Sequence, residues 1–72
     1  MEKITHVAVE YQGDIYLSDN HGKLLRIVKD FNIGEGCTFG YYTNNHNFVT
    51  GKQALRLPTP NHIKINKSFM RI

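Results

Sequence analysis

The stretch between Gly36 and Gly51 constrains the fold of this chain more than any other segment. It places aromatic and β-branched residues on both sides of a polar Asn-Asn-His-Asn segment. The aromatic residues of the two flanks are Phe39, Tyr41, Tyr42 and Phe48. Such flanks around an asparagine-rich turn are typical of a β-hairpin. The sequence therefore predicts a hairpin over residues 36–51.

The N-terminal segment shows a regular alternation from residue 4 to residue 11. One face of an extended chain would carry Thr5, Val7, Val9 and Tyr11, and the other face His6, Ala8 and Glu10. A period of two with β-branched residues predicts a strand with one buried face. The pair Gln12-Gly13 then predicts a tight turn, because glycine adopts a positive φ without steric cost.

Asp14 to Ser18 is predicted as the second strand of this N-terminal hairpin. In this prediction Ile15 and Leu17 point into the core and Tyr16 points outward. The following tetrapeptide, Asp19-Asn20-His21-Gly22, has the composition of a turn.

Residues 23–32 fit two different structures. As a strand, the segment would direct Leu25, Ile27 and Phe31 inward and complete a three-stranded meander. As a helix, the positions that match the i, i+3, i+4, i+7 spacing are Leu24, Leu25, Ile27, Val28 and Phe31. We favour the strand, because the preceding turn resembles that of a hairpin and because a two-stranded hairpin alone is only marginally stable.

The C-terminal third predicts one helix and one strand. Thr50 and Gln53 have the spacing of a capping box, and helix-forming residues follow until Pro58 disfavours further helix. Residues 62–66 alternate again and are predicted as a last strand. The predicted fold is therefore one domain over residues 1–72, mainly β (or α+β), with a small antiparallel sheet or partly open barrel of about five strands and one short helix near 51–57.

The composition bears on the cellular compartment. The single cysteine, Cys37, cannot form an internal disulfide, which favours a reducing compartment. Residues 1–11 contain two glutamates, a lysine and a histidine and lack the apolar core of a signal peptide. No apolar run approaches the roughly 18 residues of a membrane span. We therefore expect a cytoplasmic protein that does not associate with membranes.

Charge is distributed unevenly, although the net charge is only +3. Residues 1–36 carry six acids and four cations, a balance of −2. Residues 37–72 carry no acid, and their cations are Lys52, Arg56, Lys64, Lys67 and Arg71. Two interpretations stay open, an anionic partner for the second half or neutralisation of the two halves within the fold.

The residues that commonly carry catalysis show no recognised spacing. The four histidines and Cys37 include no Cys-x-x-Cys or His-x-x-x-His pair, so no metal is expected. Cys37 and His46 flank the same predicted turn and could approach each other, but a half-buried cysteine in a strand is the commoner arrangement. The acids lie mostly at predicted turns, where aspartate is expected. We therefore expect no enzymatic activity and no cofactor.

Binding of single-stranded nucleic acid is the alternative function. Proteins of this kind combine a basic groove with aromatic side chains on which the bases stack. The residues that would supply both features are Phe39, Tyr41, Lys64, Lys67 and Arg71. In a strand, Phe39 and Tyr41 share one face and Tyr42 takes the other, so one of the two faces has to build the core.

Two segments also resemble the cold-shock domain family. Ile27-Val28-Lys29-Asp30-Phe31-Asn32 and Phe39-Gly40-Tyr41-Tyr42 are similar to that family's Val-Lys-Trp-Phe-Asn and Lys-Gly-Phe-Gly-Phe segments. The resemblance implies a five-stranded barrel in which Phe31, Phe39 and Tyr41 stack on bases. Asp30 stands where the family has tryptophan, Cys37-Thr38 replaces Lys-Gly and the spacer is longer. The chain is therefore not assigned to the family.

Binding to a protein partner is the function that we expect from the sequence. Tyrosine, asparagine and arginine at predicted turns and outer faces fit the composition of protein interfaces. The residues expected to contact the partner are Tyr42, Asn44, Asn45, His46, Lys52, Arg56 and Lys64. An uncovered sheet edge at the first or last strand would be one docking surface.

The amino-acid usage suggests what kind of regulator this would be. The chain is rich in asparagine, isoleucine, lysine and tyrosine, which is typical of AT-rich genomes such as those of many bacteriophages. Short proteins of that kind often inhibit or redirect a host protein. We therefore expect a small, non-enzymatic regulatory protein, with its partner and its oligomeric state left open.

Overall fold

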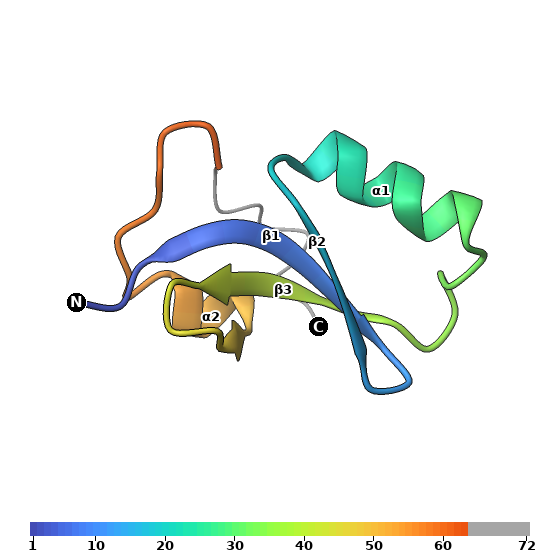
Figure 1. Cartoon of the computed structure of the whole chain (residues 1–72), viewed down its shortest axis with the longest axis horizontal. Coiled ribbons are helices and arrows are strands. Elements are labelled where there is room, and N and C mark those ends of the chain that lie inside the picture. Colours follow the sequence, from blue (N-terminus) through green and yellow to red (C-terminus); the bar gives the residue numbers. More distant parts are fainter. Residues whose placement is uncertain (64–72) are drawn as a thin grey trace.

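The computed structural model describes residues 1–63 and contains a four-stranded antiparallel sheet with two helices (Figure 1). The elements are β1 (Ile4–Tyr11), β2 (Asp14–Ser18), α1 (His21–Asp30), β3 (Thr38–Thr43), β4 (Phe48–Val49) and α2 (Gly51–Ala54). The strand order is β2-β1-β3-β4, with antiparallel pairing throughout. The predicted fold class, a small antiparallel sheet of the mainly β or α+β type, is confirmed. The first strand is central, however, so the expectation that it offers a free edge is wrong.

The hairpin of β1 and β2 has a two-residue turn at Gln12-Gly13, as predicted. Both residues have a positive φ, 51° for Gln12 and 85° for Gly13, which is the type I′ geometry that suits the twist of a hairpin. The turn fixes the register, in which Tyr11 pairs with Asp14 and Val9 pairs with Tyr16.

An irregularity near the start of β1 brings one more residue into the core. Ile4 pairs with Thr43 and His6 pairs with Tyr42, so Thr5 has no partner of its own on β3. An extra residue in one strand reverses the side-chain alternation at that point. Ile4 therefore lies on the same face as Val7 and is completely buried. Period two alone does not predict this placement.

One face of the sheet forms the core. Cross-strand partners share a face, and Val9 pairs with Tyr16 on one side and with Phe39 on the other. The prediction for β2 is therefore wrong. Tyr16 packs on the core side, whereas Ile15 and Leu17 lie on the opposite face and are 40% and 39% exposed.

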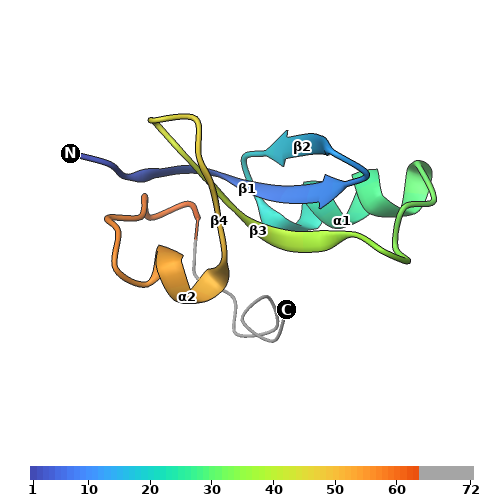
Figure 2. The same cartoon turned by 90° about the horizontal axis from the view of Figure 1, so that it is seen from below.

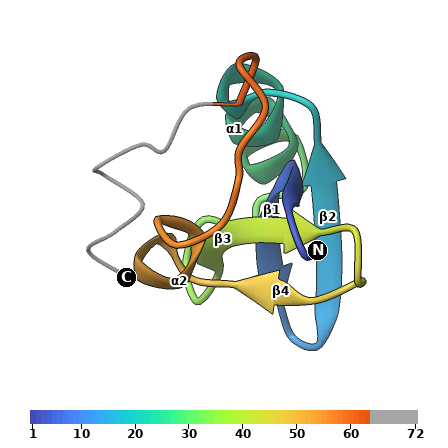
Figure 3. The ribbon, with the colours of Figure 1, turned by 90° about the vertical axis from the view of Figure 1, so that its left-hand side faces the viewer.

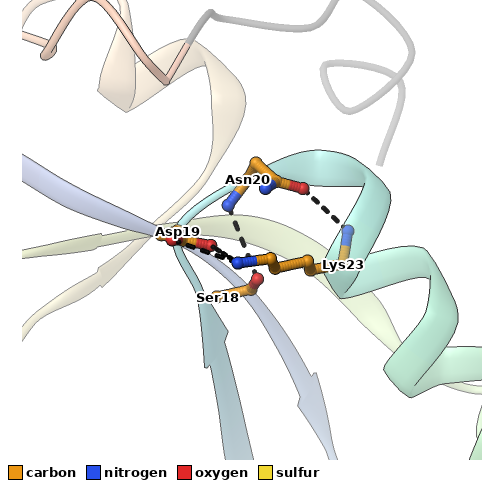
Figure 4. Close-up of polar contacts among 4 residues, drawn as sticks. All are labelled: Ser18, Asp19, Asn20 and Lys23. Carbon is orange, nitrogen blue, oxygen red and sulfur yellow. Dashed lines mark hydrogen bonds and ion pairs between the residues drawn. The ribbon is translucent and has the colours of Figure 1, made fainter.

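Residues 21–30 form helix α1, so the strand that we favoured for residues 23–32 is wrong and the alternative is right. The helix forms here because of polar contacts at its start, among Ser18, Asp19, Asn20 and Lys23 (Figure 4). The Asn20 side chain accepts a hydrogen bond from the Lys23 amide at 2.8 Å and caps the helix. Lys23 Nζ also lies 3.3 Å from an Asp19 carboxylate oxygen. The predicted hairpin turn is therefore a helix cap, a role that asparagine also favours.

Both helices contribute to the core on the same face of the sheet. Helix α1 contacts β1 and β2, while α2 contacts β3 and β4, as Figures 2 and 3 show from two directions. The buried cluster joins residues of the strands, both helices and the connecting segments: Ile4, Val7, Val9, Leu24, Ile33, Tyr41, Val49, Ala54 and Ile63. The sheet thus has a covered face, here called the core face, and an opposite face on which no described helix packs.

Helix α2 is shorter than the predicted 51–57, although its capping box at Thr50 and Gln53 is confirmed. After Ala54 the chain continues in tight turns, in which the Arg56 amide donates to the Gln53 carbonyl and the Leu57 amide to the Ala54 carbonyl. The predicted last strand, 62–66, falls mostly outside the described residues.

Residues 1–63 do not form the structure that the cold-shock resemblance implies. Its first segment begins inside α1 rather than in a strand, because Ile27 to Asp30 are helical. A five-stranded barrel would need this segment as a strand. The resemblance is therefore limited to the sequence.

Candidate partner-binding site

A hollow of about 420 Å³ lies beside β4 and α2. Its lining combines apolar and charged residues from three segments: Glu2, Val49, Lys52, Gln53, Arg56 and Leu57. Two of these, Lys52 and Arg56, are among the residues predicted to bind a partner. The other four were not predicted to bind a partner.

The capping box at the start of α2 positions the two cations of the hollow. Thr50 Oγ1 accepts a hydrogen bond from the Gln53 amide at 3.4 Å, and Gln53 Oε1 accepts one from the Thr50 amide at 2.9 Å. The Leu55 amide then donates to the Gly51 carbonyl at 3.2 Å, which continues the helical turn. Lys52 on α2 and Arg56 in the tight turn that follows it both line the hollow.

The charge of the hollow is positive on balance. Lys52 and Arg56 are exposed, and within residues 1–63 neither forms an ion pair. Glu2 also lines the hollow, but its carboxylate is already held by the hairpin, with Oε2 2.7 Å from Thr43 Oγ1 and 2.8 Å from Asn47 Nδ2. The Asn47 and Thr43 hydrogen bonds hold the pKa of Glu2 below its ordinary value. Within residues 1–63 the two cations therefore keep free hydrogen-bond donors, whereas Oε2 of the acid is held by the hairpin.

Thr43 connects the hollow to the tip of the second hairpin. Its hydroxyl donates to Glu2 and accepts hydrogen bonds from the amides of Asn45 and Asn47, both at 3.2 Å. The residue is almost completely buried. A threonine at a strand end that organises the following turn is a familiar local motif, but its link to Glu2 spans 41 positions and cannot be predicted from local sequence.

The predicted binding residues at the hairpin tip do not form one surface with the hollow. Asn44 is used internally, because its side chain accepts from the Lys3 amide and donates to the Met1 carbonyl. Tyr42 pairs with Phe48, so it lies on the face opposite Val49, and its ring is 6.2 Å from that of His46. Asn45 and His46 are exposed at the tip. Lys64 lies outside the described residues.

The aromatic platform expected for nucleic acid is absent from the described part of the chain. Tyr41 is completely buried, with its hydroxyl 3.4 Å from His21 Nε2, so it cannot stack on a base. Phe39 is half-buried against the core. The physical reason is that this face of β3 is the core face. Lys67 and Arg71, like Lys64, fall outside the described residues.

Phe31, which the cold-shock resemblance implied as a third stacking residue, packs elsewhere. Its ring meets that of Tyr16 edge-on, at a centroid distance of 5.6 Å. It therefore lies near β2 and does not join Phe39 in one platform.

The residues considered for catalysis or metal binding are kept apart. Cys37 precedes β3 and His46 follows it, and six residues of strand separate their ends by roughly 20 Å. The Cys37 thiol lies 3.5 Å from the Gly34 carbonyl. Within residues 1–63, no three histidine, cysteine or acidic side chains are grouped as metal ligands would be. Neither described helix has the length and hydropathy to cross a membrane.

Comparisons with protein-family models, with curated proteins and with solved structures find no match for this chain.

Proposed function

We propose that this protein is a non-enzymatic binding module that recognises an acidic segment of a partner protein in the hollow beside α2. The observation that carries the proposal is the pair of cations, Lys52 and Arg56, which form no ion pair within residues 1–63 and lie beside the apolar residues Val49 and Leu57. By occupying such a segment, the module would regulate the partner by blocking its other contacts.

The lining of the hollow favours a peptide that carries both a carboxylate and an apolar side chain. The Arg56 guanidinium can bind a carboxylate with two parallel hydrogen bonds, and Lys52 supplies a second positive charge. Val49 and Leu57 offer apolar surface next to these charges. Glu2 lies at the same hollow and would repel a second carboxylate nearby, which limits the charge density of the ligand.

A protein ligand is favoured over a nucleic acid for two reasons. A nucleic-acid strand presents a regular row of phosphates and bases, and its binders use several cations together with stacking aromatics. Here the described hollow has two cations and no aromatic lining, and Tyr41 is buried in the core.

The proposal can be tested with three fluorescent probes and two charge-reversal variants. The probes are a peptide of alternating glutamate and leucine, a matching peptide of lysine and leucine, and a single-stranded oligothymidylate. The site variant is Lys52→Glu combined with Arg56→Glu. The matched control is Arg26→Glu combined with Lys29→Glu, which changes the net charge by the same amount at exposed positions of α1 away from the hollow. Binding is measured by fluorescence anisotropy.

We expect the acidic peptide to bind more tightly than the basic one and the site variant to weaken it by roughly tenfold or more, since each exposed charge pair contributes a fraction of 1 kcal/mol and reversal adds repulsion. The control is expected to bind as the wild type does. Equal binding of both peptides, or an equal loss of affinity in the control with Arg26→Glu and Lys29→Glu, would contradict the proposal. Preferential, salt-sensitive binding of the oligothymidylate would contradict the proposal and support binding of single-stranded nucleic acid.

A further inference from the structure

Strand β2 is at the outer edge of the sheet and has an unused side. Its neighbour on the inner side is β1, and among the described residues no strand pairs with it on the other side. In an antiparallel ladder, alternate residues direct their amide and carbonyl groups to opposite neighbours. The pair Tyr11–Asp14 closes the two-residue turn, so the backbone amide and carbonyl of Asp14 point to β1. Counting from there, the same holds for the backbone groups of Tyr16 and Ser18. Ile15 and Leu17 therefore direct their backbone groups to the open edge.

This edge lacks the features by which proteins usually prevent edge pairing. Such features are a very short strand, a lysine or proline on the strand, or a bulge that twists it away. β2 has five residues, contains neither lysine nor proline and pairs with β1 in an unbroken register. Its only charged residue is Asp14, at one end.

Apolar side chains flank the open edge on both faces of the sheet. Ile15 and Leu17 lie on the face opposite the core and are 40% and 39% exposed. Near the same strand on the core face, Phe31 is 59% exposed and its ring meets that of Tyr16. An exposed strand edge bordered by apolar groups on both sides is suited to accept another strand.

We propose that two copies of the chain pair through β2, antiparallel and with two-fold symmetry about Tyr16. This arrangement places Ile15 of one copy opposite Leu17 of the other, Tyr16 opposite Tyr16 and Asp14 opposite Ser18. The two four-stranded sheets then form one continuous sheet. The inference does not depend on the acidic ligand, because the hollow lies at the other end of the strand order.

A second copy fits this edge because the strand is complementary to itself in that register. The residues that point to the open edge, Ile15 and Leu17, become each other's partners and exchange backbone hydrogen bonds in both halves of the interface. Their side chains form one apolar row across the junction on the face opposite the core. Asp14 meets the uncharged Ser18, so no like charges face each other. A five-residue edge is a small interface, and the dimer is therefore expected to be weak and concentration-dependent.

The first test is sedimentation velocity of the full chain from low micromolar to near-millimolar concentration. We expect the wild type to shift towards the dimer over this range. Leu17→Lys is expected to raise the dissociation constant of the dimer at least tenfold, because a charged lysine on an edge strand disfavours pairing with a second strand. Leu17→Pro is expected to act similarly by removing an outward amide. The matched control is Leu55→Lys, at a 55% exposed position after α2, which is expected to dimerise as the wild type does.

A second test fixes the register by disulfide trapping, in a background in which Cys37 is replaced by serine. Tyr16→Cys is expected to form a disulfide-linked dimer under oxidised glutathione, because the symmetric pairing brings these two positions within the range of a disulfide. Asp14→Cys is the control and is expected to remain unlinked, since the two copies of residue 14 lie four positions apart in this register.

The proposal is overturned if the wild type stays monomeric throughout the concentration range. It is also overturned if a folded Leu17→Lys variant, as judged by circular dichroism, dimerises as tightly as the wild type. Trapping at Asp14→Cys in place of Tyr16→Cys would contradict the register and with it the symmetric pairing.

Discussion

The two edges of the sheet are built differently. β4 has two residues, is followed at once by α2 and borders a hollow that contains two cations. β2 has five residues, carries one acid at its end and is bordered by exposed Ile15, Leu17 and Phe31. The β4 edge is therefore short and bordered by charged side chains, whereas the β2 edge is longer and bordered by exposed apolar side chains.

Our two proposals assign a different kind of recognition to each edge of the sheet. In the first, charged side chains at the β4 end select a ligand. In the second, unpaired backbone groups at the β2 edge pair with a strand of suitable register. Two of the cations of the basic second half of the sequence, Lys52 and Arg56, lie together at the β4 end of the sheet.

The largest effect is expected from Leu24→Ala, which removes the side chain that anchors α1 to the β2 end. Leu24 is completely buried in the core cluster. The variant is expected to lose about 2–5 kcal/mol of unfolding free energy, through lost burial and a cavity. Urea denaturation measures it. Leu25→Ala, at the neighbouring 51% exposed position, should change stability by no more than about 0.5 kcal/mol. Equal losses at both positions would contradict the helix orientation.

The second largest effect is expected from a substitution of Gly40 that displaces β4. A Cβ at this position would lie 2.5 Å from the Val49 carbonyl oxygen and 2.6 Å from the Phe48 ring. Gly40→Ala is expected to cost about 1–3 kcal/mol and to weaken ligand binding in the hollow, because β4 has to move. The control is Gly34→Ala, where the nearest atom would be 3.7 Å away. A fully stable Gly40→Ala variant would show that β4 is not fixed in this position.

Thr43→Val removes the hydroxyl that joins the hairpin to Glu2 while keeping the shape of the side chain. The partly buried hydrogen bonds from the Asn45 and Asn47 amides and the contact with Glu2 are lost together. We expect a decrease of about 1–2 kcal/mol in unfolding free energy, since three hydrogen bonds lose their shared partner. Thr43→Ser, which keeps the hydroxyl, should recover most of it. Failure of serine to do so would assign the effect to packing.

The smallest effect is a pH dependence that distinguishes the two ends. Burial lowers the pKa of His21, next to the start of α1, below its ordinary 6.5. As the pH falls, the His21 imidazole is therefore protonated at a higher pH in the unfolded chain than in the folded one. Stability is full above about pH 6.5 and declines below it. Glu2 has a lowered pKa as well, so its contribution declines only below about pH 4.5.

Urea denaturation of the wild type and of His21→Gln across this range tests the assignment. The variant should lose the decline that begins near pH 6.5 and keep the one that begins near pH 4.5. An unchanged profile in His21→Gln would show that His21 is not the group responsible.

Much of the fold could be predicted from local sequence. The turn at Gln12-Gly13, the strands on either side of it and the capping box at Thr50 and Gln53 depend on residues that are close in the chain. Both hairpins and the general class of the fold followed from these signals. Residues 21–30 could not be decided in this way, because Asn20 suits a hairpin turn and a helix cap equally.

The remaining features depend on contacts between distant segments. The assignment of Tyr16 to the core face requires the register of β2 on β1, and the burial of Ile4 requires the irregularity at Thr5. The hollow needs Glu2 to meet residues 49–57 across most of the chain. Of the predicted binding residues within 1–63, Lys52 and Arg56 alone line the hollow, and they are near neighbours in the chain.

Amide hydrogen exchange followed by NMR at a series of protein concentrations compares the two edges in one experiment. We expect the amides of Ile15 and Leu17 to become more protected as the concentration rises, because a second copy pairs with them. Protection of the β4 amides at Phe48 and Val49 should not change. Protection at Ile15 and Leu17 that is independent of concentration, or that increases at β4 instead, would show that β2 is not the edge that pairs.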